Sequence, residues 1–299
     1  MASLRLLYRD YDRAPYLYTL KHAAALRGLE LVIEKAPLGG RYPEFLVEGA
    51  TDLLAENYWG LQSLAFNGTP IVSLVTAVTW LNETLFVHPD IDRVSDLRGR
   101  KFAIRGTGPS ELIPGLWLQD NGLGEDVTPV IYSEKDVGRW GQWRQVVSGA
   151  CHGTFVTNFY QNEPRNAGLK EMPIGRYGFI GNVTLSTLEP TIAARKDDIQ
   201  TLVEAAFDAT YLFINDPEAA LAICRGEPMR LLEFSADADT VKLYHILRSE
   251  LSAYPIPSAE GISNTRRMRL PRNPELADFN PLAMWDLSFA RSALRTRLG

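Results

Sequence analysis

Short strand-like and helix-like runs alternate through the first third of this chain. Strand-like runs cover residues 4–8, 29–35, 52–55 and 70–78, and helical runs are expected at 18–27, 43–48 and 61–66. This alternation predicts βαβ units and a largely parallel or mixed sheet. It returns in a second set of strands, expected at residues 85–88, 102–104, 127–132 and 153–156. We therefore predict an α/β fold with two lobes.

The second lobe is expected to interrupt the first. We predict a discontinuous lobe one of residues 1–87 and 180–299, and a lobe two of residues 88–179. On the return we expect a strand at 179–185, a helix at 199–215 with one apolar face, a surface tail at 255–281 and a last helix at 283–297. Asp216 and Pro217 are expected to begin another short helix, with Asp216 as its N-cap and Pro217 at its first position. Two lobes joined this way form a hinge, and a ligand is expected in the interlobe cleft, at the carboxyl ends of the strands.

The bulk composition excludes several classes of protein. The chain has 299 residues, 45% of them hydrophobic, which suffices for a full core. A net charge of −5 argues against a nucleic-acid partner. The scattered histidines show no metal-ligand spacing, and no phosphate-loop or dinucleotide fingerprint is present, so neither a metal nor a cofactor is expected. Cys151 and Cys224 are expected to be free thiols.

The first residues bear on location. No apolar run approaches the roughly 20 residues of a membrane span. The first strand begins at Leu4 and charged residues follow from Arg9, whereas a secretory signal would show an apolar stretch and a cleavage site. This predicts a cytoplasmic protein, the alternative being a periplasmic protein from which the signal has been removed.

The stretch "SDLRGRKFAIRGTGPSE" at 95–111 predicts an anion site. A short strand runs into a glycine-rich turn, and a helix is expected to open directly behind it. Backbone N–H groups and the positive end of a helix, with the hydroxyls of Thr107 and Ser110, suit a carboxylate, sulfonate or phosphate. Gly106, Thr107, Gly108 and Ser110 are therefore candidate ligand residues. The alternative is a plain turn with glycine where the backbone requires it.

Several segments in a fixed order resemble the type II periplasmic-binding-protein superfamily. They are "FLVEGATDLL" (45–54), "NGTPIVSLVTAV" (67–78), "SDLRGRKFAIRGTG" (95–108), "WRQVVSGACHGTFVTNFY" (143–160), "LVEAAFDATYLFINDPEAALAI" (202–223) and "NPLAMWDLSFARSAL" (280–294). The nitrate, sulfonate and thiamine-pyrimidine binding branch is the most similar. The resemblance implies two Rossmann-like lobes joined by two crossover strands. It also implies an ABC-transporter solute-binding protein, whose partner would be a membrane permease.

A narrower resemblance points to an enzyme. "RDYDR" (9–13) and "TDLLAENY" (51–58) resemble the openings of 4,5-dihydroxyphthalate decarboxylases, which are cytoplasmic enzymes on the same fold. "LGGRYPEFLVEG" (38–49) is similar to sulfinate desulfinases. However, Tyr11 and Asp12 stand where those enzymes have a nucleophilic cysteine, and Pro37 stands where they have an arginine. These departures argue against a cysteine-based desulfinase.

Polar and aromatic residues follow the predicted strands, where that fold turns side chains toward its ligand. Glu56 could act as a general acid or base among aromatic neighbours, and Asp12 is the second candidate for this role. Arg13 could clamp a carboxylate, or could pair with Asp10 or Asp12. The remaining ligand-binding candidates are Tyr11, Arg41, Tyr42, Asn57, Tyr58, Trp59, Thr79, Trp80 and Asn158.

The sequence leaves three functions open for a small, anionic and partly aromatic ligand. The first is a cytoplasmic, cofactor-free lyase of decarboxylase type acting on a carboxylate or sulfonate. The second is a transport receptor for a ligand of nitrate, sulfonate or aromatic-acid type, and the third is a cytoplasmic ligand sensor. The oligomeric state stays open.

Overall fold

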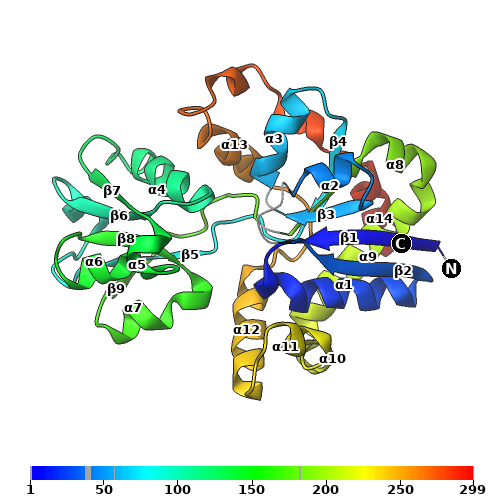
Figure 1. Cartoon of the computed structure of the whole chain (residues 1–299), viewed down its shortest axis with the longest axis horizontal. Helices are drawn as coiled ribbons and strands as arrows, with labels where there is room; N and C mark the ends of the chain where they lie inside the picture. Colours follow the sequence, from blue (N-terminus) through cyan, green and yellow to red (C-terminus); the bar gives the residue numbers. More distant parts are fainter. Residues whose placement is uncertain (1, 38–41, 57, 182, 299) are drawn as a thin grey trace. The chain divides into compact units, whose positions relative to one another are not determined.

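The computed structural model describes residues 2–37, 42–56, 58–181 and 183–298, which form two compact units (Figure 1). Unit 1 consists of Met1–Trp80, Gly178–Ser263 and Asp278–Gly299, and unit 2 consists of Leu81–Tyr177 and Asn264–Ala277. Each unit has its own five-stranded sheet. No helix in the described part of the chain combines the length and the hydropathy needed to span a membrane.

The sheet of unit 1 is mixed. Its strands, in spatial order, are β2 (Leu29–Lys35), β1 (Ala2–Tyr8), β3 (Leu53–Glu56), β10 (Thr184–Leu188) and β4 (Ile71–Thr76). β1 runs parallel to β2 and β3, and β10 runs antiparallel to β3 and β4 (Figure 1). The carboxyl ends of the four parallel strands therefore meet the amino end of β10 at one edge of the sheet.

Helices cover both faces of this sheet (Figure 1). On one face lie α1 (Ala14–Leu26), α9 (Lys196–Asn215) and α14 (Ser288–Leu298); on the other lie α2 (Glu44–Val47), α3 (Tyr58–Phe66) and the 3₁₀ turn η6 (Pro281–Met284). Leu7 and Leu54 join the core cluster with Tyr42 and Leu46. Because side chains alternate along a strand, the neighbouring buried Leu6 points to the opposite face.

The remaining helices of unit 1 come after β10 in the chain, one before α9 and the others after it. They are α8 (Glu189–Ala194), α10 (Pro217–Cys224), α11 (Glu227–Leu231), α12 (Asp237–Glu250) and α13 (Ala259–Arg267), the last of which continues into unit 2. The predicted cap of α10 is confirmed. Asp216 accepts a hydrogen bond from the N–H of Ala219 at 3.1 Å, and Pro217 occupies the first helical position.

The sheet of unit 2 is also mixed. Its order is β7 (Thr128–Tyr132), β6 (Lys101–Arg105), β8 (Gly153–Thr157), β5 (Glu83–Val87) and β9 (Lys170–Met172). β6 runs parallel to β7 and β8, whereas β5 runs antiparallel to β8 and β9. Phe86, Trp143 and Val156 belong to the core cluster of this unit, and the ring of Trp117 meets that of Phe155 edge-on at 5.3 Å.

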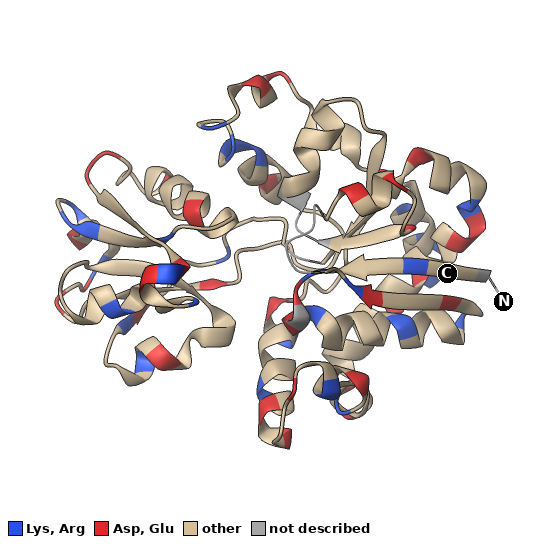
Figure 2. Cartoon of the chain, in the orientation of Figure 1, with Lys and Arg blue, Asp and Glu red and all other residues tan. Residues whose placement is uncertain are grey.

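Four short helices connect the strands of unit 2. They are α4 (Pro109–Asp120), α5 (Glu134–Val137), α6 (Arg144–Val147) and α7 (Asn162–Asn166). α4 packs against β6 and β8. Figure 2 shows lysine and arginine interspersed with aspartate and glutamate in both units.

Two predicted elements begin later than the sequence pattern indicated. The strand expected at 179–185 is observed as β10, because the N–H groups of Phe179 and Gly181 first donate to the carbonyls of Thr79 and Val78, both at 3.0 Å. The last helix, expected at 283–297, begins at Ser288. The preceding residues extend along β4, where the N–H of Asp286 donates to Ser73 O at 3.1 Å.

The tail at 255–281 was expected to run over the surface, and this expectation is wrong for much of its length. It contains α13, and Ile262 and Met268 are buried. Part of the tail, Asn264–Ala277, belongs to unit 2, although the predicted boundaries placed it in lobe one. Arg267 forms an ion pair with Asp120 there, a long-range contact that local sequence patterns do not reveal.

Candidate functional site

The strand register of unit 2 brings distant residues to one sheet edge. β6 ends at Arg105 and leads through the glycine turn into α4, while β8 ends at Thr157, just before Asn158. β5 runs the opposite way, so its first residue, Glu83, pairs with Thr157 at this same edge. We call Glu83, Arg105, Gly106–Ser110 and Asn158 the unit 2 edge site. The sequence predicted its glycine turn, Ser110 and Asn158, but not Glu83 or Arg105.

Both glycines of the turn are required by its geometry. Gly108 has φ 56° and ψ −147°, a backbone region that is essentially open only to glycine. A Cβ on Gly106 would lie 2.7 Å from the side chain of Ile131 on the neighbouring strand. The geometry of the turn alone therefore explains why glycine is present at both positions. Whether the turn can bind an anion depends on its free hydrogen-bond donors.

The donors of the turn divide into two groups. The N–H of Gly106 donates to Tyr132 O and that of Thr107 donates to Arg105 O, both at 2.9 Å. Within the described residues, the N–H groups of Gly108 and Ser110 have no acceptor, as is usual at the start of a helix. The backbone donors left for an anion are therefore those of Gly108 and Ser110.

Glu83 is a buried carboxyl at the start of α4. Its Oε1 accepts a hydrogen bond from the Ser110 hydroxyl at 2.8 Å. Its Oε2 is buried without a hydrogen-bond partner among the described residues. Burial raises the pKa of Glu83 to about 7, although Ser110 and Arg105 act in the opposite direction. The only signal in the sequence was an acidic residue at the head of the apolar run "ETLFV".

Arg105 brings a positive charge that is already balanced. Its Nε and Nη2 both donate to Oε1 of Glu134, at 2.9 and 2.6 Å. The guanidinium also stacks on the ring of Trp140, with the centroid 4.3 Å away. A longer contact of 3.5 Å joins its Nη1 to the Ser110 hydroxyl. Arg105 therefore supports the edge site mainly as half of an ion pair.

Asn158 directly follows β8 at the same edge of the unit 2 sheet. Its Oδ1 accepts from the Thr84 hydroxyl at 2.9 Å, and its backbone N–H donates to Asn82 O at 3.1 Å. The side chain is half-buried, as is that of Thr107. Thr84 follows Glu83 in β5, so its side chain points to the opposite face of the sheet. Asn158 is therefore bonded on that face and not on the α4 face, where Glu83 meets Ser110.

In unit 1, Arg13, a predicted ligand-binding residue, forms an internal ion pair. Arg13 lies in the 3₁₀ turn η1 (Tyr11–Arg13) and is buried, and its guanidinium donates to the buried carboxylate of Glu250 in α12. The half-buried Asp12 lies 3.4 Å from it. Burial by itself lowers the pKa of Arg13, but Asp12 and Glu250 more than offset this and raise it. The sequence had offered Asp10 and Asp12 as partners; Glu250 was not anticipated.

Tyr42, Thr79 and Trp80 also follow strands in unit 1. The Tyr42 hydroxyl is buried and lies between the carbonyls of Leu7, at 2.5 Å, and Ala55, at 3.2 Å, which joins the ends of β1 and β3. The Thr79 hydroxyl lies 2.5 Å from that of Ser252. Trp80 is half-buried and bridges Gly178 in an antiparallel pairing.

Six further predicted residues lie outside what the structure describes, wholly or in their side chains. Arg41 and Asn57 are not among the described residues, and for Tyr11, Glu56, Tyr58 and Trp59 only the backbone is described. Their roles stay predictions, as does the predicted ligand site between the lobes.

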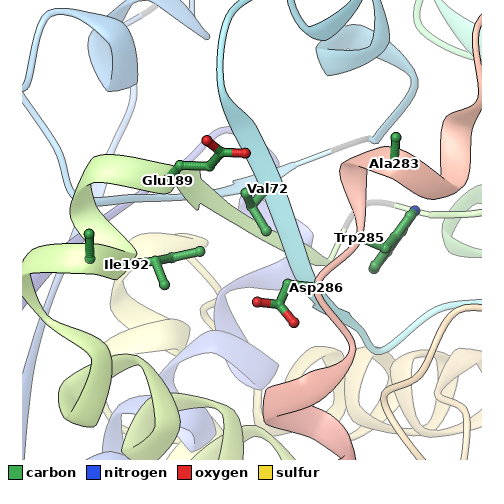
Figure 3. Close-up of a pocket in the computed structure, with 7 residues that line it drawn as sticks. Val72, Glu189, Ile192, Ala283, Trp285 and Asp286 are labelled. Atoms are coloured by element: carbon green, nitrogen blue, oxygen red, sulfur yellow. The ribbon is translucent and has the colours of Figure 1, made fainter.

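A hollow of about 270 Å³ lies elsewhere in unit 1 (Figure 3). Its lining residues are Val72, Glu189, Ile192, Ala193, Ala283, Trp285 and Asp286. It lies where β10 ends and α8 begins, which is the sheet edge opposite to the carboxyl ends of β1 and β3. The hollow is lined by two carboxylates and by apolar side chains, and the negative charge of the carboxylates would repel an anion. This hollow is therefore not the predicted anion site.

No metal or thiol chemistry is indicated in the described part of the chain. It contains no group of three or more histidine, cysteine, aspartate or glutamate residues arranged to hold a metal ion. Cys151 and Cys224 are both free and buried. Burial raises the pKa of each thiol, which disfavours the nucleophilic thiolate.

Two mixed sheets with helices on both faces, built by a chain that passes between two units, define the type II periplasmic-binding-protein fold. The predicted fold class and superfamily are confirmed. Residues 25–220, more than half of the chain, match the family model described as NMT1/THI5 like, and the chain belongs to this family.

Solved structures support the same fold. A putative periplasmic sulfonate-binding protein of a sulfonate ABC transporter from Methylobacillus flagellatus KT aligns with a TM-score of 0.74 and 16% identity, covering 100% of this chain and 95% of that one. The periplasmic aliphatic sulphonate binding protein from Escherichia coli gives 0.67 and 16%, with 95% and 91% covered. The desulfurization enzyme DSZB gives 0.63 and 15%, with 99% and 100% covered. No curated protein matches the chain.

Proposed function

We propose that this chain is the solute-binding receptor of an ABC-type importer and that its ligand is a small organic anion of sulfonate or carboxylate type. The observation that carries the proposal is the start of α4 in unit 2. There the N–H groups of Gly108 and Ser110 are without acceptors among the described residues, beside the Ser110 hydroxyl. Such a helix terminus offers hydrogen bonds and a positive dipole to one anionic group.

The comparisons support a receptor better than a decarboxylase. Two of the similar structures are named as periplasmic sulfonate-binding proteins, and their folds cover nearly all of this chain. A receptor needs donors that hold an anion, whereas a lyase also needs a group that moves a proton at the substrate. A periplasmic location and a membrane permease as partner follow from the receptor proposal.

Ligand class is tested by thermal unfolding with a panel of small molecules. The anions are ethanesulfonate, benzenesulfonate, benzoate and nitrate, and the comparison set is glucose, arabinose and choline. A ligand at a hundred times its Kd stabilises the folded state by about 2.7 kcal/mol, which raises Tm by several degrees. Stabilisation by glucose or choline, with no anion active, contradicts the proposal.

A matched pair of serine variants tests the place of binding. Ser110→Ala removes a hydroxyl at the start of α4, and we expect about a tenfold weaker affinity for the active anion, since a hydrogen bond to a charged group contributes about 1.5 to 3 kcal/mol. Ser148→Ala removes an exposed hydroxyl of the same unit that bonds only to Gln145 O at 3.1 Å. Its affinity should equal that of the unaltered protein. Equal affinities in both variants would place the ligand elsewhere.

A further inference from the structure

A carboxyl group stands among the donors of the proposed anion site. The Glu83 carboxyl lies 2.8 Å from the Ser110 hydroxyl oxygen, and Ser110 is the second residue of α4. Glu83 is 8% exposed, and its Oε2 has no hydrogen-bond partner in the described structure. If Glu83 were ionised, its charge would oppose any anion bound at the start of this helix.

The Ser110 hydroxyl creates a second conflict. A serine hydroxyl has a single hydrogen to donate, and in this structure it goes to Oε1 of Glu83. The same hydrogen cannot also bind an anion. Protonation of Glu83 removes both conflicts, because the neutral acid can donate its own hydrogen and leaves the Ser110 hydrogen available for the ligand.

We infer that binding of the anion at the start of α4 is coupled to uptake of one proton by Glu83. This inference rests on the proposed function. The proton comes from solvent and adds to the Glu83 carboxylate, and no other bond forms or breaks. The added hydrogen on Glu83 then points to the Ser110 oxygen, so that Ser110 can turn its own hydrogen toward the ligand.

The charges around Glu83 favour this behaviour. Arg105 is the basic group that acts on it, and Arg105 is held by Glu134. On β8 the facing residue is the uncharged Thr157, and on α4 the next acid, Glu111, pairs with Arg272. In the described part of unit 2, no unpaired cation therefore holds Glu83 ionised. Burial raises its pKa to about 7, so modest changes of pH or of bound charge can protonate it.

The test is the affinity for ethanesulfonate and benzenesulfonate between pH 5.5 and pH 8.5, measured by calorimetry in buffers without sulfonate groups. These probes stay ionised throughout, so only the protein titrates. We expect a nearly constant Kd below the pKa of Glu83 and a Kd that rises about tenfold per pH unit above it, as one linked proton requires. Glu83→Gln, which keeps a neutral donor, should bind with little dependence on pH.

Two further variants sharpen the result. Glu125→Gln neutralises an exposed acid of the same unit and should retain the pH dependence of the unaltered protein. Ser110→Ala removes a hydrogen bond that lowers the pKa of Glu83, so the midpoint should move to higher pH even though affinity falls. If Glu83→Gln does not fold, the midpoint for Ser110→Ala and the slope of Kd against pH for the unaltered protein still test the proton coupling.

The outcomes separate the inference from the function. Sulfonate binding with a flat pH profile, or an unchanged slope in Glu83→Gln, overturns the proton coupling and leaves the receptor intact. Tighter binding at high pH also overturns it, since the ionised Glu83 would then accept a hydrogen bond from the ligand. Failure of every sulfonate and carboxylate to bind at pH 5.5, where Glu83 is neutral, refutes the proposed function and the inference with it.

Discussion

Replacing Glu83 by glutamine should change how the stability of the free protein depends on pH. In the folded chain the pKa of Glu83 is raised to about 7, with burial as the largest cause. A glutamate in the unfolded chain has a pKa of about 4.3. Between these values the folded state holds a proton that the unfolded state has lost. The stability from this group is therefore present at low pH and is lost as the pH rises through about 7.

The magnitude follows from the difference between the two pKa values. Each pKa unit corresponds to about 1.4 kcal/mol, so the full penalty of ionised Glu83 is about 4 kcal/mol above neutral pH, of which about 1 kcal/mol is already present at pH 5. Glu83 is only 8% exposed, so solvent screens this penalty little. Between pH 5 and pH 8 the unaltered protein should lose about 2 to 3 kcal/mol of stability relative to Glu83→Gln.

The assay is urea unfolding at pH 5, 6.5 and 8, followed by tryptophan fluorescence. Trp117, Trp140 and Trp143 report on unit 2, which contains Glu83. Glu125→Gln serves as the control, because this exposed acid should change stability equally little at each pH. Parallel stability curves for Glu83→Gln and the unaltered protein would refute the assignment of a raised pKa to this buried carboxyl.

Three further predictions concern the buried ion pair, the glycine turn and a thiol. Arg13→Met leaves Glu250 buried without its cation and should lower the free energy of unfolding in urea by about 3 to 5 kcal/mol. The double variant Arg13→Met, Glu250→Leu should recover most of this loss. A double variant as unstable as Arg13→Met would contradict the prediction. Gly108→Ala places a side chain at φ 56° and should cost about 1 to 3 kcal/mol. Gly115→Ala, inside α4 with open space around it, should stabilise slightly; equal effects of the two would refute the strain at Gly108. Cys224 is buried with its pKa raised to about 12, so it should react with a thiol reagent only in urea, and rapid labelling of the folded protein would contradict this.

Local patterns were sufficient for most elements of the fold. The apolar strand runs, the periodic face of the helix at 199–215 and the Asp216–Pro217 cap all depend on residues close together in the chain, and the structure shows each element within a few residues of its predicted place. The errors came where partners are remote. β10 begins late because Phe179 and Gly181 pair with residues that precede the second unit, and α13 was missed in a tail rich in proline and arginine.

For the candidate site too, features built from neighbouring residues could be predicted and remote partners could not. The glycine turn before α4 was readable, because a strand, a turn and a helix start are contiguous in "KFAIRGTGPSE". Glu83 was not, because it stands 27 residues before Ser110 and two residues ahead of the strand expected at 85–88. Arg13 could be placed after its strand, but its partner Glu250 is 237 residues away.

The class of fold and the glycine turn before α4 can be predicted from the sequence, since both depend on backbone preferences and apolar periodicity that act over a few residues. Which charges are buried, and with which partners, depends on the tertiary packing. β5 runs antiparallel to β8, and this register sets the carboxyl of Glu83 against the hydroxyl of Ser110. Burial of a charged group changes its pKa through neighbours that are distant in sequence, so the chemistry of this edge follows from packing rather than from any motif.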